Sequence, residues 1–137
     1  MTPQPIRSLL QSQALLVLGR ILLTFMFWSS GLAKLIDFQE GVGEMAHFGL
    51  EPAWIFNLAT IIVQLGGSLL VIVNRQAWLG AGALAVFTVL TIPLAHPFWA
   101  MPQPQATMEM YVVMEHITVV GGLVLAAILG VRSNPSA

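Results

Sequence analysis

The sequence lacks cysteine and contains very few charged residues. With Cys 0, it offers no disulfide, no thiolate nucleophile and no cysteine ligand for an iron–sulfur cluster, zinc or any other cofactor. Charged residues make up 8% of its 137 residues, whereas a soluble domain carries roughly 25%. Lipid must therefore cover most of the surface. The net charge of −1 gives no reason to expect a nucleic-acid partner.

Four stretches of the chain are apolar enough to cross a membrane, which takes about 20 residues each. They cover residues 14–35, 54–73, 77–95 and 108–131. Helix is the only secondary structure expected there, because backbone groups in lipid must be satisfied within their own segment. The sequence therefore predicts an all-α membrane protein, a single domain over residues 1–137 that forms a four-transmembrane-helix bundle.

The segments between the spans differ in length and composition. Residues 74–76 predict a tight turn that makes an antiparallel hairpin of spans two and three. Residues 96–107 contain prolines and should be irregular, and the polar tail after Val131 should fray. Residues 36–53 predict a short interfacial helix after the first span. Its apolar and polar side chains would lie on opposite faces: Phe38, Val42 and Met45 against Glu40, Glu44 and His47.

The distribution of basic residues predicts the orientation of the bundle. Basic residues accumulate in cytoplasmic flanks, and three arginines flank one side against a single lysine on the other: Arg7, Arg75 and Arg132 against Lys34. We therefore expect both termini in the cytoplasm. A weak recurrence of residues 22–33 at residues 84–95 leaves open whether the bundle consists of two tandem hairpins.

Several short motifs, in their order and spacing, resemble the DoxX family. They are Gly19-Arg20-Ile21, Gly31-Leu32-Ala33-Lys34-Leu35, Gln64-Leu65-Gly66-Gly67, His96-Pro97-Phe98-Trp99 and Gly121-Gly122-Leu123. The resemblance implies a four-helix bundle in the bacterial inner membrane with a link to redox systems, because relatives include a subunit of a thiosulfate:quinone oxidoreductase. The chain departs from the family at Gln64, where Glu is common, and at Glu115-His116, where Lys-Asn is common.

Polar residues within membrane spans are costly and usually functional. Arg20 and Gln64 form a candidate polar pair in the inner half, where Arg20 either reaches headgroups and polar partners or contacts a substrate. Helix rise places Lys34 within about 6 Å of Glu115 in depth, which predicts an ion pair. That pair either binds a ligand or only joins spans one and four. The candidate ligand site is an outer-half cluster: Lys34, Asn57, His96, Glu115 and His116.

The remaining candidates concern packing and metal binding. The histidines show no ligand spacing such as H-x-x-x-H, so no metal site is predicted, and no residue is assigned a catalytic role. Small residues let helices approach closely in lipid. We therefore predict that both glycine pairs, Gly66-Gly67 and Gly121-Gly122, face other helices rather than lipid.

Three hypotheses about function remain open. The first is an accessory, non-catalytic subunit linked to an oxidoreductase or quinone system, since a quinone needs only an apolar cleft and one or two polar groups. The second is a small-solute transporter or channel, suggested by Glu115 and His116 within a span. The third is a structural scaffold for another membrane protein. The expected partners are membrane lipid, an oxidoreductase subunit and further copies of the chain.

Overall fold

The computed structural model describes residues 2–133, and within them every regular element is a helix. This confirms the predicted all-α membrane fold. The polar tail predicted to fray lies outside the described residues, except for Arg132 and Ser133, which end the last helix. The elements, in chain order, are α1 Gln4–Leu10, α2 Gln13–Leu23, α3 Phe25–Ile36, α4 Phe38–His47, α5 Ala53–Val73, α6 Ala77–Ala95, η1 Phe98–Ala100 and α7 Gln105–Ser133.

Three of these helices are long and apolar enough to cross a membrane by themselves. They are α5, α6 and α7, and α5 and α6 match the predicted second and third spans almost residue for residue. The fourth span was predicted from Met108, but α7 already begins at Gln105. Its first turn can start there because Pro104, which has no N–H to satisfy, directly precedes it.

The prediction of one continuous helix over residues 14–35 is wrong. The chain there forms α2 and α3, separated at Thr24. At this break the carbonyl oxygen of Ile21 accepts hydrogen bonds from the Trp28 indole (3.3 Å) and the Thr24 hydroxyl (3.4 Å). Side-chain donors of this kind let a membrane helix bend without leaving a backbone group unsatisfied. A further short helix, α1, precedes α2 at an angle of 58°, and the two together are also long enough for a crossing.

The turn between α5 and α6 and the segment between α3 and α5 both follow the sequence closely. The turn between α5 and α6 places Asn74 (φ 55°) and Gln76 (φ 50°) in the left-handed region, which Asn tolerates better than most residues. Helix α4 is the predicted short helix, with Met45 buried and Glu44 and His47 exposed. The Asp37 side chain caps it by accepting from the Glu40 N–H at 3.0 Å.

The glycine pairs each have one packed and one open member. A Cβ on Gly67 would lie 2.8 Å from Leu84 Cγ, and one on Gly122 would lie 2.8 Å from Leu23 Cδ1. Both positions therefore face other helices, as predicted. The prediction is wrong for Gly66 and Gly121, where a Cβ would meet nothing within 4 Å. Adjacent helical residues point about 100° apart, so a pair cannot place both members in one contact.

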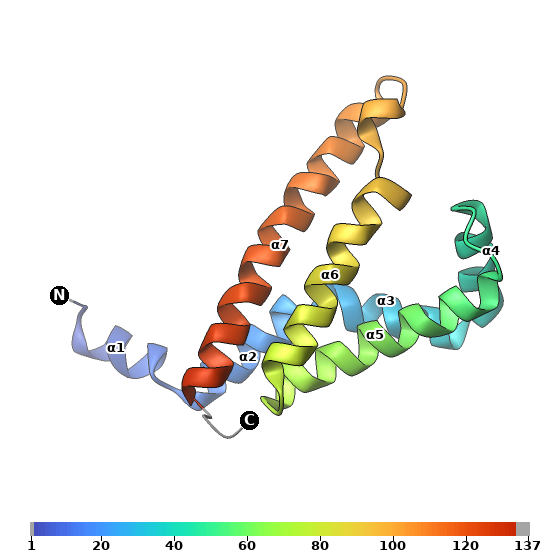
Figure 1. Cartoon of the computed structure of the whole chain (residues 1–137). Coiled ribbons are helices and arrows are strands. Elements are labelled where there is room, and N and C mark those ends of the chain that lie inside the picture. The colour runs from blue at the N-terminus through green and yellow to red at the C-terminus, as the bar shows by residue number, and fades with distance from the viewer. Residues whose placement is uncertain (1, 134–137) are drawn as a thin grey trace.

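The helices diverge from a common packed end. Figure 1 shows α6 and α7 side by side, and α5 leaving the 74–76 turn in a different direction, with α3 beside it and α4 at its far end. The apolar core lies where these helices are still close, and its fully buried members come from four of them: Phe27, Val71, Leu84 and Leu123. Beyond this core the divergence leaves room for a cavity between α3–α5 and α6.

Candidate functional site

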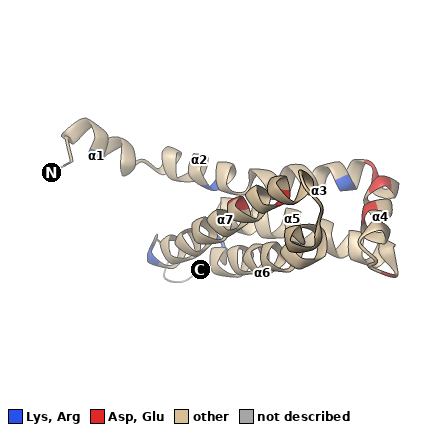
Figure 2. Cartoon of the chain, turned by 90° about the horizontal axis from the view of Figure 1, so that it is seen from above, with Lys and Arg blue, Asp and Glu red and all other residues tan. Residues whose placement is uncertain are grey.

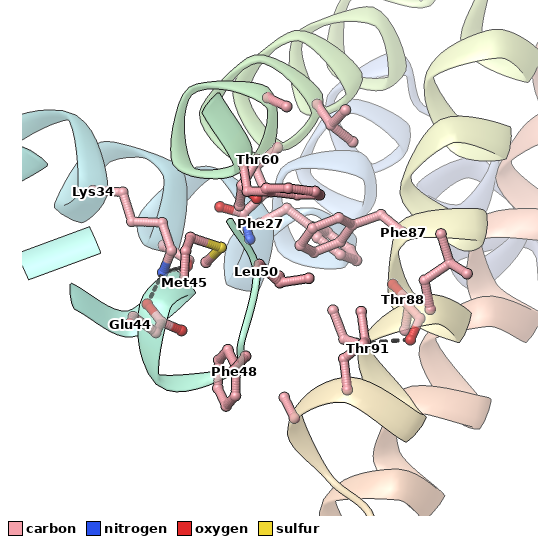
Figure 3. Close-up of a pocket in the computed structure, with 18 of the residues that line it drawn as sticks. Phe27, Lys34, Glu44, Met45, Phe48, Leu50, Thr60, Phe87, Thr88 and Thr91 are labelled. Atoms are coloured by element: carbon pink, nitrogen blue, oxygen red, sulfur yellow. Dashed lines mark hydrogen bonds and ion pairs between the residues drawn. The ribbon is translucent and has the colours of Figure 1, made fainter. Parts of the chain in front are cut away.

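A cavity of about 430 Å³ opens between α3, α4, α5 and α6, with His116 of α7 at one side. Figure 3 shows its lining, in which Phe27, Phe48 and Phe87 provide apolar surface and threonines lie among them. The volume falls within the range of roughly 300–1,000 Å³ that is usual for small-molecule sites. The walls are mainly apolar, with polar groups concentrated at a few points.

One polar point is an ion pair at the α4 end of the cavity. Lys34 Nζ lies 2.6 Å from Glu44 Oε2 and 3.4 Å from Ser30 Oγ. Lys34 is at the end of α3, and the chain folds back at Asp37 so that α4 brings Glu44 to it (Figure 3). The lysine side chain is 13% exposed and the glutamate 43%. The ion pair therefore lies at the edge of the cavity, with the lysine mostly buried in its wall and the glutamate partly exposed at the outer surface.

The predicted ion pair between Lys34 and Glu115 is wrong. Lys34 pairs with Glu44 instead, and within residues 2–133 Glu115 takes part in no ion pair. Glu115 is exposed on α7, whereas its neighbour His116 is buried. The prediction compared helix rise alone, and helix rise does not say which way a helix turns each side chain. Glu115 does not line the cavity.

A second polar point lies at the opposite side, where α6 ends and α7 begins. His96 Nδ1 donates to Glu109 Oε2 at 2.6 Å, and the rings of His96 and His116 meet edge to face with centroids 4.9 Å apart. His116 Nδ1 lies 2.8 Å from the Val112 carbonyl oxygen. Because a carbonyl can only accept, that nitrogen carries the proton, and Nε2 is the nitrogen left for a ligand.

The middle of the cavity carries uncharged polar groups from α5 and α6. Gln64 is 6% exposed, and its Oε1 has no hydrogen-bond partner within the described chain. Thr60 lies one turn earlier on α5, and Thr88 faces from α6, where its hydroxyl donates to the Leu84 carbonyl oxygen at 2.7 Å. A buried amide oxygen without a donor is costly. A ligand with a hydroxyl or N–H group would satisfy it.

The other predicted site residues occupy different places. Asn57 is fully buried, and its Nδ2 donates to the Phe38 carbonyl oxygen at 3.2 Å, so it attaches α4 to α5 instead of lining the cavity. Arg20 is 4% exposed and lines a separate hollow between α2 and α7. No hydrogen bond joins Arg20 to Gln64, and Arg20 Nη2 has no partner in residues 2–133. The predicted cluster thus keeps Lys34, His96 and His116 around one cavity.

Sequence reasoning missed Glu44, Glu109 and the threonines of the cavity. Glu44 was placed on the polar face of α4, and that face is exposed, but the reversal of the chain at Asp37 also turns it to Lys34. Glu109 follows His96 by 13 residues. The proline-rich connection between them reverses the chain direction, and this reversal is the signal from which the contact between His96 and Glu109 could have been predicted.

The fold and the cavity together define a multi-pass membrane protein with an internal, mainly apolar cavity. The DoxX family model matches residues 15–97, which run from α2 to the end of α6. The chain belongs to the DoxX family. Neither a curated protein nor a solved structure matches it.

Proposed function

We propose that this DoxX-family protein is an accessory subunit of a quinone-linked oxidoreductase system in the bacterial inner membrane, and that its cavity binds the quinone. The observation that carries the proposal is the 430 Å³ apolar cavity with polar groups at its two sides. A quinone has an apolar tail and a ring with two opposed oxygens. Such a molecule needs apolar walls and a hydrogen-bonding group at each oxygen.

The polar groups of the lining suit the two oxygens. The Lys34 ammonium is a donor to a quinone oxygen at the α4 side, and His116 Nε2 is an acceptor for a quinol hydroxyl at the α7 side. Gln64, between them, offers an unsatisfied amide oxygen to a quinol hydroxyl. Reduction of a quinone takes up protons at its oxygens. The His96–Glu109 pair beside His116 supplies groups that can hold a proton next to the cavity.

Quinone retention tests the cavity directly. The chain is extracted from bacterial membranes in a mild neutral detergent, and the quinone per protein is measured by mass spectrometry after solvent extraction. Wild type should retain quinone, and Thr91→Phe, which fills the cavity, should reduce retention by about tenfold or more, a loss of roughly 1.4 kcal/mol. Thr118→Phe is the matched control, because Thr118 is exposed on α7 away from the cavity. Equal retention in both variants contradicts the proposal.

The partner can be identified by cross-linking in intact cells. A photoreactive residue in place of exposed His47 on α4 should capture a flavin- or metal-containing oxidoreductase subunit. Capture of further copies of this chain alone would indicate a homo-oligomer and contradict the accessory role. The same photoreactive variant, cross-linked after solubilisation in detergent, serves as the control for chance collisions.

The orientation that the proposal requires has both termini in the cytoplasm. Because the chain has no cysteine of its own, single cysteines can be introduced and labelled with a membrane-impermeant reagent. His47→Cys should label in intact cells, and Arg75→Cys only after the membrane is opened. The reverse pattern would overturn the assignment.

A further inference from the structure

A second hollow, which shares no lining residue with the quinone cavity, lies between α1–α2 and α7. It has a volume of about 300 Å³ and its lining is leucine, glycine and alanine apart from one charged residue, Arg20. We call it the Arg20 groove. The residues that matter for its shape are Leu16, Gly19 and Leu23 on α2 and Gly122, Leu125 and Leu129 on α7.

Arg20 has no counter-charge within residues 2–133. Its side chain is 96% buried, since its exposed fraction is 4%, and Nη2 has no hydrogen-bond partner in residues 2–133. None of the six acidic residues lies in α1, α2, α5 or α6. Figure 2 shows the acidic positions at α4 and on α7 only. The two ion pairs of the described chain, Lys34–Glu44 and His96–Glu109, do not involve Arg20.

A buried guanidinium without an anion is strongly unfavourable in an apolar surrounding. Residues 2–133 supply no anion to Arg20, so its counter-charge comes from outside them. Arginine presents a planar fork of donors that matches phosphate oxygens in a bidentate arrangement. The leucines around Arg20 in turn match an alkyl chain, so the groove combines one anion contact with an elongated apolar wall.

The position of α1 indicates where the anion enters. Helix α1 has no buried residue, and its apolar side chains Ile6, Leu9 and Leu10 are spaced for one face, with Arg7 and Ser8 on the other. This pattern is typical of a helix at the membrane surface. Leu10 of α1 also lines the groove, so the groove begins at the level of lipid headgroups.

We propose that the Arg20 groove binds one anionic phospholipid, with its phosphate at Arg20 and an acyl chain along α2 and α7. Basic pockets between membrane helices are a usual setting for phosphate headgroups. The site is separate from the quinone cavity and does not depend on the function proposed for it.

Native mass spectrometry of the full chain in neutral detergent tests the charge contact. The probes are dioleoyl phosphatidylglycerol and dioleoyl phosphatidylcholine, which differ in net charge but not in acyl chains. Wild type should bind the anionic lipid at least about tenfold more tightly, as expected for a charge-assisted contact. Arg20→Gln should remove this preference, and Arg20→Lys should retain part of it. Arg75→Gln, at an exposed arginine outside the groove, should retain all of it.

Filling the groove gives a second test that does not alter the charge. A Cβ at Gly19 would meet nothing within 4 Å, so Gly19→Leu should place its side chain in the groove without a clash and reduce binding of both lipids. Gly82→Leu is the control, since Gly82 on α6 is equally open but lines neither cavity. This pair decides the question if Arg20→Gln does not fold.

Four results with the purified protein would overturn the proposal. They are the same affinity for both lipids in wild type, an equal loss for Arg75→Gln and Arg20→Gln, unchanged binding in Gly19→Leu, and thermal protection by inorganic phosphate equal to that by phosphatidylglycerol. The last would indicate a soluble anion instead of a lipid. A carboxylate-bearing partner helix cross-linked at Gly19→Cys in cells would likewise replace lipid as the counter-charge.

Discussion

The two sides of α5 are joined to their neighbours by different kinds of contact. On the α6 side, backbone meets backbone, because a Cβ at Gly80 would lie 2.6 Å from the carbonyl oxygen of Gly67. On the α4 side, glycine makes room for a polar side chain: a Cβ at Gly41 would lie 2.8 Å from Asn57 Cγ. Asn57 of α5 donates there to the Phe38 carbonyl oxygen, and the Lys34–Glu44 ion pair ties α4 to the neighbouring α3.

The difference predicts which wall of the 430 Å³ cavity can adjust. Backbones in contact cannot rearrange without moving whole helices, so α5 and α6 form a fixed frame. Side-chain contacts can change by rotamer, so α4 can shift while α5 and α6 stay in place. Helix α4 and the residues after it carry Glu44, Met45, Phe48 and Leu50 of the lining, which makes it the adjustable wall.

The largest expected effect is at the fixed frame. Gly67→Leu inserts a side chain 2.8 Å from Leu84 Cγ, and Leu84 is fully buried and has no space to move into. Overpacking should lower the free energy of unfolding by about 3 kcal/mol. Unfolding in mixed micelles with increasing dodecyl sulfate measures it. If the free energy of unfolding falls less in this variant than in a variant on the α4 side, the α5–α6 contact is not the more rigid of the two.

The next effect is at the polar attachment of α4. Asn57→Ala removes the donor to the Phe38 carbonyl oxygen, and the free energy of unfolding should fall by about 1–2 kcal/mol. Because this contact holds α4 and not the frame, proteolysis of the segment between α3 and α5 should accelerate more than global unfolding. Equal changes in both measurements would show that α4 is part of the frame.

A smaller effect is expected at the Lys34–Glu44 ion pair. Its glutamate is 43% exposed, so solvent weakens the interaction and the coupling energy should be below about 1 kcal/mol. A double-mutant cycle with Lys34→Met and Glu44→Gln measures it. Quinone retention should nevertheless fall in Lys34→Met and not in Glu44→Gln, because only the lysine is proposed to contact the ligand. Identical retention in the two variants would argue against that contact.

The smallest effect is expected at the open glycines. A Cβ at Gly66 or Gly121 would meet nothing within 4 Å, so Gly66→Leu and Gly121→Leu should each change the free energy of unfolding by less than about 0.5 kcal/mol. The same unfolding assay applies. A large loss at Gly66 would mean that this face of α5 contacts a second copy of the chain or a partner.

The long helices could be predicted from the sequence because a single local property decides them. Any run of about 20 apolar residues must satisfy its backbone internally in lipid, so α5, α6 and α7 were predicted with small errors at their ends. The break at Thr24 was not. It depends on Trp28 reaching the Ile21 carbonyl, and a composition rule contains no information about one indole.

The candidate site was predicted only in part for a related reason. Lys34, His96 and His116 were identified because polar residues are rare in apolar spans, and all three line the cavity. Asn57 was identified by the same rule but supports α4 instead. The rule finds unusual residues, but it does not say whether each one contacts a ligand, another helix or lipid.

The sequence by itself determined that the protein is an all-α membrane protein, where its long helices run and which residues are exceptional in them. Only the tertiary structure decided that Lys34 pairs with Glu44, that Glu115 faces outward and that Arg20 has no counter-charge within residues 2–133. The physical reason is the range of the forces involved. Transfer into lipid acts on each segment independently, whereas the partner of a charge depends on helix rotation and divergence, which the packing of all segments sets together.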